Sequence, residues 1–98
     1  MVTTEWVLTE VADALSHPRH RDAVSDFFRL LRDDPAVAIV PASADLFAQG
    51  MHLFERRRDK HWPLTDCISF VVMEDEGIGE ALTGDRHFEQ AGFKALLV

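Results

Sequence analysis

The segment WPLTDCISFVVM, residues 62–73, predicts a helix that is apolar on nearly every side. Thr65 is expected to cap the amino end of this helix, because threonine is a favoured N-cap residue. Asp66 follows in the first turn, where a carboxylate complements the positive end of the helix dipole. A helix without a broad polar face must be buried, so we expect this helix to lie in the interior of the fold.

The residues that follow predict two short strands with a helical turn between them. ALT, residues 81–83, is expected to form one strand, residues 85–90 the turn, and residues 94–98 the last strand. Asp85 therefore stands where a strand ends, and in parallel α/β sheets ligands collect beyond the carboxyl ends of the strands. Taken by itself, Asp85 is better explained as a helix N-cap.

The residues before the segment predict three more helices and another strand. Apolar side chains at helical spacing indicate helices over residues 7–15 and 24–31, which end before Pro18 and Pro35. AVAIV, residues 36–40, is expected to be a strand buried on both faces, and Ser43 is expected to cap a third helix. Helices that alternate with short apolar strands predict an α/β fold in which helices flank a parallel sheet.

Composition places the chain among soluble globular proteins of one domain, residues 1–98. Hydrophobic residues make up 47% and charged residues 28%, and the net charge is −7, which argues against non-specific coating of nucleic acid. The single cysteine, Cys67, excludes an internal disulfide, so we expect a reducing cytoplasm. No apolar run reaches the ~20 residues that a membrane helix requires.

Three carboxylates are candidates for a metal site, although each has an ordinary explanation. Glu10 falls on a side of its helix that periodicity alone would call solvated, and Asp66 and Asp85 suit helix amino ends. If the three side chains met, the repulsion between them would favour a bound cation. A hard divalent ion, Mg²⁺ or Mn²⁺, prefers such oxygen ligands.

Basic residues cluster in ERRRDKHWP, residues 55–63. Beside Trp62 they could contact phosphates and stack a base, whereas basic residues in the last turn of a helix ordinarily offset its dipole. The five histidines show no metalloprotease spacing and are expected at the surface. Cys67 and Ser69 have no neighbouring base in the sequence, which argues against nucleophilic catalysis.

Taken together, VLTEVADAL (residues 7–15), WPLTDCISFVVM and ALTGDRHFEQAGF (residues 81–93) resemble the PIN domain family of small metal-dependent ribonucleases. This family includes the VapC-type toxins of bacterial toxin–antitoxin pairs. The resemblance implies a three-layer α/β fold, with Mg²⁺ or Mn²⁺ in an acidic pocket and RNA as the substrate. Glu10, Asp66 and Asp85 match the family's second, third and fourth acids, and Thr65 and Thr83 match neighbours that shape the pocket. The residues expected to steer RNA are Arg56, Arg57, Arg58, Lys60, Arg86 and His87.

The sequence departs from the family pattern at its amino end. PIN domains open with an apolar strand that ends in an aspartate, whereas VTT, residues 2–4, resembles the second strand. We therefore expect the first acid, the central strand and the first helix to be missing. Strands that lack their neighbour leave backbone edges unpaired, which predicts a homodimer or larger assembly.

The sequence leaves two alternative functions open. One follows from the missing amino-terminal strand and its acid, and the other from the acidic residues that are present. An incomplete metal site would leave an interaction module for an antitoxin-like peptide. A receiver-type phospho-acceptor domain also clusters acids on a parallel α/β fold. Such a domain requires a pair of acids very early and a lysine beside a late strand, and Lys94 matches that requirement poorly.

Overall fold

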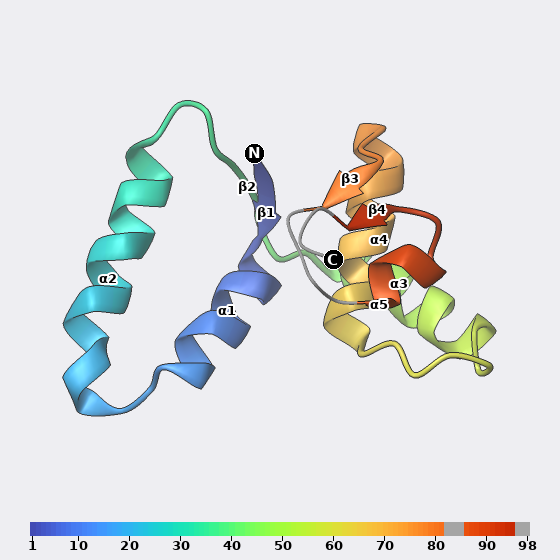
Figure 1. Cartoon of the computed structure of the whole chain (residues 1–98), viewed down its shortest axis with the longest axis horizontal. Helices are drawn as coiled ribbons and strands as arrows, with labels where there is room; N and C mark the ends of the chain where they lie inside the picture. The colour runs from blue at the N-terminus through green and yellow to red at the C-terminus, as the bar shows by residue number, and fades with distance from the viewer. Residues whose placement is uncertain (82–85, 96–98) are drawn as a thin grey trace. The chain divides into compact units, whose positions relative to one another are not determined.

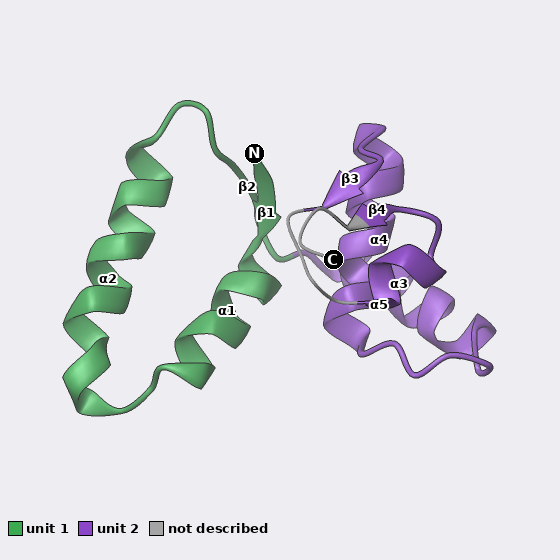
Figure 2. Cartoon of the chain, in the orientation of Figure 1, with its two compact units in different colours: residues 1–42 green, residues 43–98 purple. Residues whose placement is uncertain are grey.

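The computed structural model describes residues 1–81 and 86–95. The chain forms two compact units, unit 1 (Met1–Ala42) and unit 2 (Ser43–Val98) (Figure 2). Parallel strands and a majority of helical residues confirm the α/β class predicted from the sequence. The prediction that residues 1–98 form one domain remains a prediction.

Unit 1 consists of a two-stranded parallel sheet and two helices (Figure 1). Its elements are β1 (Val2–Thr4), α1 (Glu5–Ala14), α2 (Pro18–Asp33) and β2 (Ala38–Val40). Thr4, which is 2% exposed, ends β1 and caps α1, because its Oγ1 accepts a hydrogen bond from the Val7 N–H at 3.2 Å. Pro18 occupies the first turn of α2, where the missing N–H costs no helical hydrogen bond.

The strand predicted over residues 36–40 is shorter and less buried than expected. β2 covers only Ala38–Val40, with Ala38 exposed and Ile39 and Val40 half-buried. The expectation of burial on both faces is therefore wrong. Within the described residues β2 pairs with β1 alone, so no further strand covers its other edge.

Unit 2 begins with two packed helices and ends with a second parallel strand pair. Its elements are α3 (Ala44–Arg56), α4 (Leu64–Glu76), β3 (Glu80–Ala81), α5 (Arg86–Gln90) and β4 (Lys94–Ala95). Ser43 caps α3 as predicted, since its Oγ accepts from the Leu46 N–H at 3.1 Å. Residues 82–83 and 96–98, which the predicted strands include, lie outside the described residues.

The core of unit 2 is built on α4, as the apolar segment at residues 62–73 predicted. Phe70 is 2% exposed and lies edge-on to Trp62 and Phe88, with ring centroids 5.1 and 4.8 Å away. The prediction for Thr65 is wrong: α4 begins at Leu64, its N-cap is Pro63, and no side chain caps it. Thr65 instead lies half-buried in the first turn.

Candidate functional site

The amino end of α4 places the Asp66 carboxylate close to a histidine from another element. Asp66 lies in the first turn of α4, and its Oδ2 is 3.2 Å from Nδ1 of His87 in α5. Both side chains are largely shielded, with 18% of Asp66 and 28% of His87 exposed. The contact fixes the direction of the carboxylate, because the imidazole nitrogen and the carboxylate oxygen are at hydrogen-bonding distance.

His87 is the residue whose place sequence reasoning missed. The sequence predicts surface histidines and gives His87 a role in steering RNA, whereas the structure shows it half-buried against Asp66. The one signal in the sequence is its position two residues after Asp85, beside a candidate acid. A contact between α4 and α5 arises only when the two elements pack together, so periodicity could not reveal it.

The three predicted acids belong to separate segments of the chain. Glu10 lies exposed on α1 of unit 1, whereas Asp66 belongs to unit 2. Asp85 and Thr83 lie outside the described residues. Thr65 directly precedes Asp66 in the same helical turn. Convergence of Glu10, Asp66 and Asp85 therefore remains a prediction.

The Asp66 carboxylate has the chemistry of a ligand for a divalent cation. Carboxylate oxygen is the ligand that Mg²⁺ and Mn²⁺ prefer, and the shielded Asp66 carboxylate suits that chemistry. Over residues 1–81 and 86–95, no group of three His, Cys, Asp or Glu side chains could hold a metal ion. Asp66 is thus a fitting ligand, and a complete site with Glu10 and Asp85 remains a prediction.

The Cys67 thiol beside Asp66 is unsuited to nucleophilic catalysis. Cys67 is fully buried in α4. Burial raises the pKa of the thiol, and the charge of Asp66 raises this pKa further. The thiolate is the reactive form of cysteine, so this environment suppresses it, in line with the sequence analysis.

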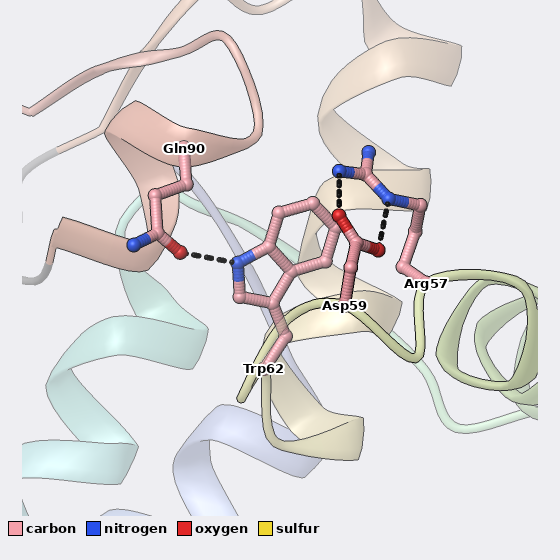
Figure 3. Close-up of polar contacts among 4 residues, drawn as sticks. All are labelled: Arg57, Asp59, Trp62 and Gln90. Atoms are coloured by element: carbon pink, nitrogen blue, oxygen red, sulfur yellow. Dashed lines mark hydrogen bonds and ion pairs between the residues drawn. The ribbon is translucent and has the colours of Figure 1, made fainter.

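The basic segment after α3 is partly committed to contacts within unit 2 (Figure 3). Arg57 binds Asp59 through two hydrogen bonds of 3.0 Å, and its guanidinium lies 4.9 Å from the centroid of the Trp62 ring. Trp62 Nε1 donates to Gln90 Oε1 at 3.0 Å. Since Trp62 is only 4% exposed, the base-stacking role that the sequence suggested for it is wrong.

The remaining cationic candidates differ in exposure. Arg56, Arg58 and Arg86 are exposed, and Lys60 is half-buried. Asp59 neutralises Arg57, and this partner raises the pKa of the guanidinium and lowers the pKa of the carboxyl. Of the six predicted RNA contacts, the exposed arginines are thus the best placed to meet a phosphate.

A hollow of about 630 Å³ lies between α3 and α4, away from Asp66. Its floor is apolar and includes Leu53, Trp62 and Phe70, whereas its rim has Arg56 from α3 and Glu74 from α4. A surface with an apolar floor and both charges at its rim suits an amphipathic peptide better than a polyanion.

Among the described residues no helix is both long and apolar enough to cross a membrane.

Comparison with known proteins identifies the family. The PIN domain model matches residues 1–94. The 23S rRNA-specific endonuclease VapC20 of Mycobacterium tuberculosis, strains H37Rv and CDC 1551, is 31% identical over 94 residues, which are 95% of this chain and 70% of that protein.

The crystal structure of M. tuberculosis VapC20, a sarcin–ricin loop cleaving toxin, matches with a TM-score of 0.78 and 32% identity. The match covers 94% of this chain and 70% of the other. The family model over residues 1–94 and the solved structure agree, and the chain belongs to the PIN domain family.

Proposed function

We propose that this chain is a divalent-metal-dependent endoribonuclease of the toxin type. The observation that supports it most directly is the shielded Asp66 carboxylate, held by His87, in a chain that matches the PIN domain over residues 1–94. Relatives at 31% identity are 23S rRNA-specific endonucleases, so a ribosomal stem–loop is the first substrate to test. The proposed setting is the cytoplasm, where ribosomal RNA is found.

The proposed ion is Mg²⁺ or Mn²⁺, with Glu10, Asp66 and Asp85 as ligands. Such an ion, when bound, supplies an activated water and offsets negative charge on a phosphodiester. Asp66 offers a carboxylate whose direction His87 fixes at 3.2 Å. Asp85 is two residues from His87 in the sequence, which supports a place for it near the same helix end. Thr65 and Thr83 are proposed to shape the pocket.

Exposed cations are proposed to bring the RNA to this acidic chain. The net charge of −7 repels phosphates, so local positive charge is needed beside the carboxylates. Arg86 is exposed and directly precedes His87. Arg56 at the end of α3 and Arg58 after it are exposed too. Arg57 and Lys60 are proposed to support these contacts more weakly, since Arg57 is bound to Asp59 and Lys60 is half-buried.

The decisive experiment measures cleavage of a sarcin–ricin stem–loop RNA in the presence of Mg²⁺ or Mn²⁺. Asp66→Asn should lower the cleavage rate by more than about 100-fold, because it removes a proposed metal ligand. Removing a residue that only hydrogen-bonds to a ligand typically lowers activity 10- to 100-fold. His87→Gln removes such a hydrogen-bonding residue and should lower the cleavage rate by about 10- to 100-fold. Asp75→Asn is the matched control, since Asp75 is an exposed acid of the same helix.

The same variants separate the enzyme from a non-catalytic interaction module. Calorimetric titration with Mn²⁺ should show binding to the unmodified chain and to Asp75→Asn, and loss of binding in Asp66→Asn. Equal cleavage by the Asp66→Asn and Asp75→Asn proteins would refute the catalytic proposal. Absence of both binding and cleavage in the unmodified chain would favour the module.

The proposed partners are RNA, an antitoxin protein and a further copy of the chain. The apolar floor of the hollow between α3 and α4 supports a peptide partner. Within the described residues, β1 and β2 pair only with each other, which supports self-association at an open strand edge.

A further inference from the structure

Four basic side chains gather where α1 passes into α2. This connection lies at the end of unit 1 away from its two strands (Figure 1). His17 stands in the connection, and Arg19, His20 and Arg21 stand at the start of α2. His17, Arg19 and Arg21 are exposed, and His20 is half-buried. These four residues form the α1–α2 patch.

The side chains of the α1–α2 patch are held by one another and by the backbone. Arg21 Nε donates to the Ser16 carbonyl oxygen at 2.9 Å. Arg19 Nε donates to His20 Nε2 at 3.2 Å, and its backbone N–H donates to His17 Nδ1 at 3.2 Å. Both guanidinium groups are therefore anchored through Nε. Their terminal nitrogens form no hydrogen bond within residues 1–81 and 86–95.

These contacts leave the patch with hydrogen-bond donors to offer a ligand. A guanidinium has N–H donors only. Each imidazole accepts a hydrogen bond from Arg19 at one ring nitrogen, so its other ring nitrogen carries the proton and donates. A phosphodiester is the complementary group, because its oxygens accept and it carries negative charge.

Two acids flank the patch in the sequence without neutralising it. Asp13 precedes the patch in α1 and Asp22 follows it in α2, and both are exposed. The ion pairs between described residues include neither acid, and they include neither Arg19 nor Arg21. The patch thus keeps its positive charge in a chain whose net charge is −7.

The other two arginines of α2 have local explanations that Arg19 and Arg21 lack. Arg29 pairs with Asp26 at 3.3 Å. Arg32 stands in the last turn, where a cation complements the helix dipole. Arg19 and Arg21 stand at the opposite end, where a cation opposes the dipole. Local stability therefore gives no reason for the patch, whereas binding of an anion does.

We propose that the α1–α2 patch binds backbone phosphates of the RNA substrate outside the cleaved bond. This inference rests on the proposed ribonuclease function, which makes RNA the polyanion at hand. Protein interfaces are commonly anchored by a buried apolar or aromatic side chain, whereas the side chains of this patch are all basic. Because the whole chain repels phosphates, such local positive charge is needed to hold the RNA.

Fluorescence anisotropy with a labelled sarcin–ricin stem–loop RNA tests the patch directly, in EDTA so that the RNA stays intact. The double variant Arg19→Gln/Arg21→Gln should bind at least about tenfold more weakly at low salt. The slope of log affinity against log salt should fall by about 2, since each lost phosphate contact removes about 1. Arg19→Lys/Arg21→Lys keeps both charges and should keep the slope.

Two further variants control for net charge. Arg29→Gln/Arg32→Gln removes two positive charges from the same helix outside the patch, and it should change the affinity far less than Arg19→Gln/Arg21→Gln does. Asp22→Asn removes an acid beside the patch and should strengthen binding. Circular dichroism establishes that each variant retains its helices.

Cleavage kinetics distinguish the patch from the catalytic proposal. Arg19→Gln/Arg21→Gln should raise KM and leave kcat unchanged, because the contact is made equally in the ground state and the transition state. Binding that depends on the patch in a chain that does not cleave RNA would refute the ribonuclease and not the patch.

Two results would overturn the proposal. The first is an unchanged affinity and salt slope in the Arg19→Gln/Arg21→Gln protein. The second is loss of binding to polyglutamate in this variant with full retention of RNA binding, since the patch would then serve an acidic protein.

Discussion

At the residue scale, the Cys67 thiol makes stability depend on alkaline pH. Burial, aided by the Asp66 charge, raises the pKa of Cys67 above its ordinary value. The thiol of the unfolded chain has a pKa of about 8.5. The contribution of the protonated thiol to stability is therefore fully present below that pH, and it is lost as the pH rises towards the higher pKa of the folded state. Urea denaturation at a series of pH values above 8 should show the free energy of unfolding decreasing.

Cys67→Ala isolates this effect from other alkaline titrations. The chain contains no tyrosine, which removes one group that would otherwise ionise in this range. The variant is expected to be less stable at neutral pH, because it leaves a cavity in the core. Its free energy of unfolding should nevertheless decrease less steeply with pH. Parallel slopes for the two proteins would contradict a buried, protonated Cys67.

The sequence predicted the position of Asp66 but not its environment. An acid behind Thr65, at the start of an apolar helix, belongs in the first turn, where the structure places it. The 3.2 Å contact with His87 depends on how α5 packs against α4, which no local pattern encodes. For the same reason the sequence suggested that Trp62 is exposed and could stack a base, whereas tertiary packing buries its ring.

At the element scale, Gly50 sets how closely α3 approaches α4. A Cβ at Gly50 would overlap Cγ1 of Ile68, which is 1% exposed. Alanine favours a helix over glycine by about 1 kcal/mol, but overpacking a core typically costs about 1–3 kcal/mol. We therefore expect Gly50→Ala to destabilise the protein by up to about 2 kcal/mol in chemical denaturation.

Gly79→Ala provides the control, because no atom lies within 4 Å of a Cβ built there and its φ is not positive. This substitution should change stability by less than about 0.5 kcal/mol. Ile68→Ala removes Cγ1, the atom that the new Cβ would overlap, so the double variant Gly50→Ala/Ile68→Ala should be less destabilised than the sum of the two single variants. Stabilisation by Gly50→Ala alone would show that the two helices separate easily.

Helices were more predictable than strands for a physical reason. Four helices span ten or more residues, and Ser43 marks the start of one of them, although α2 begins at Pro18, six residues before the predicted helix over residues 24–31. β3 and β4 have two residues each within the described chain, too few for a pattern. The sequence predicted Thr65 as the N-cap of α4, two positions after the actual N-cap. Pro63 occupies the N-cap position without a side-chain hydrogen bond, so the preference for a capping side chain did not apply.

At the scale of the whole molecule, burial is divided unequally between the two units. The buried apolar side chains of the described residues all belong to unit 2, where Trp62, Cys67, Phe70, Met73 and Phe93 form one cluster. In unit 1, Thr4 is the buried side chain, and the apolar rows of α1 and α2 are half-buried or exposed. Composition cannot reveal this division, because both halves of the sequence contain amphipathic helices.

This difference predicts unequal protection against hydrogen exchange. Segments with few buried apolar contacts open at a lower free energy than a packed core. Amides of α1 and α2 should therefore exchange at least about tenfold faster than those of α4. Hydrogen exchange followed by mass spectrometry resolves these helices as separate peptides.

One further measurement tests the cause of such a difference. Gly50→Ala should accelerate exchange in α3 and α4, which it separates, and leave α1 unchanged. Uniform protection across both units would instead mean that residues 1–98 open as one cooperative domain, since a single opening reaction then governs all the amides.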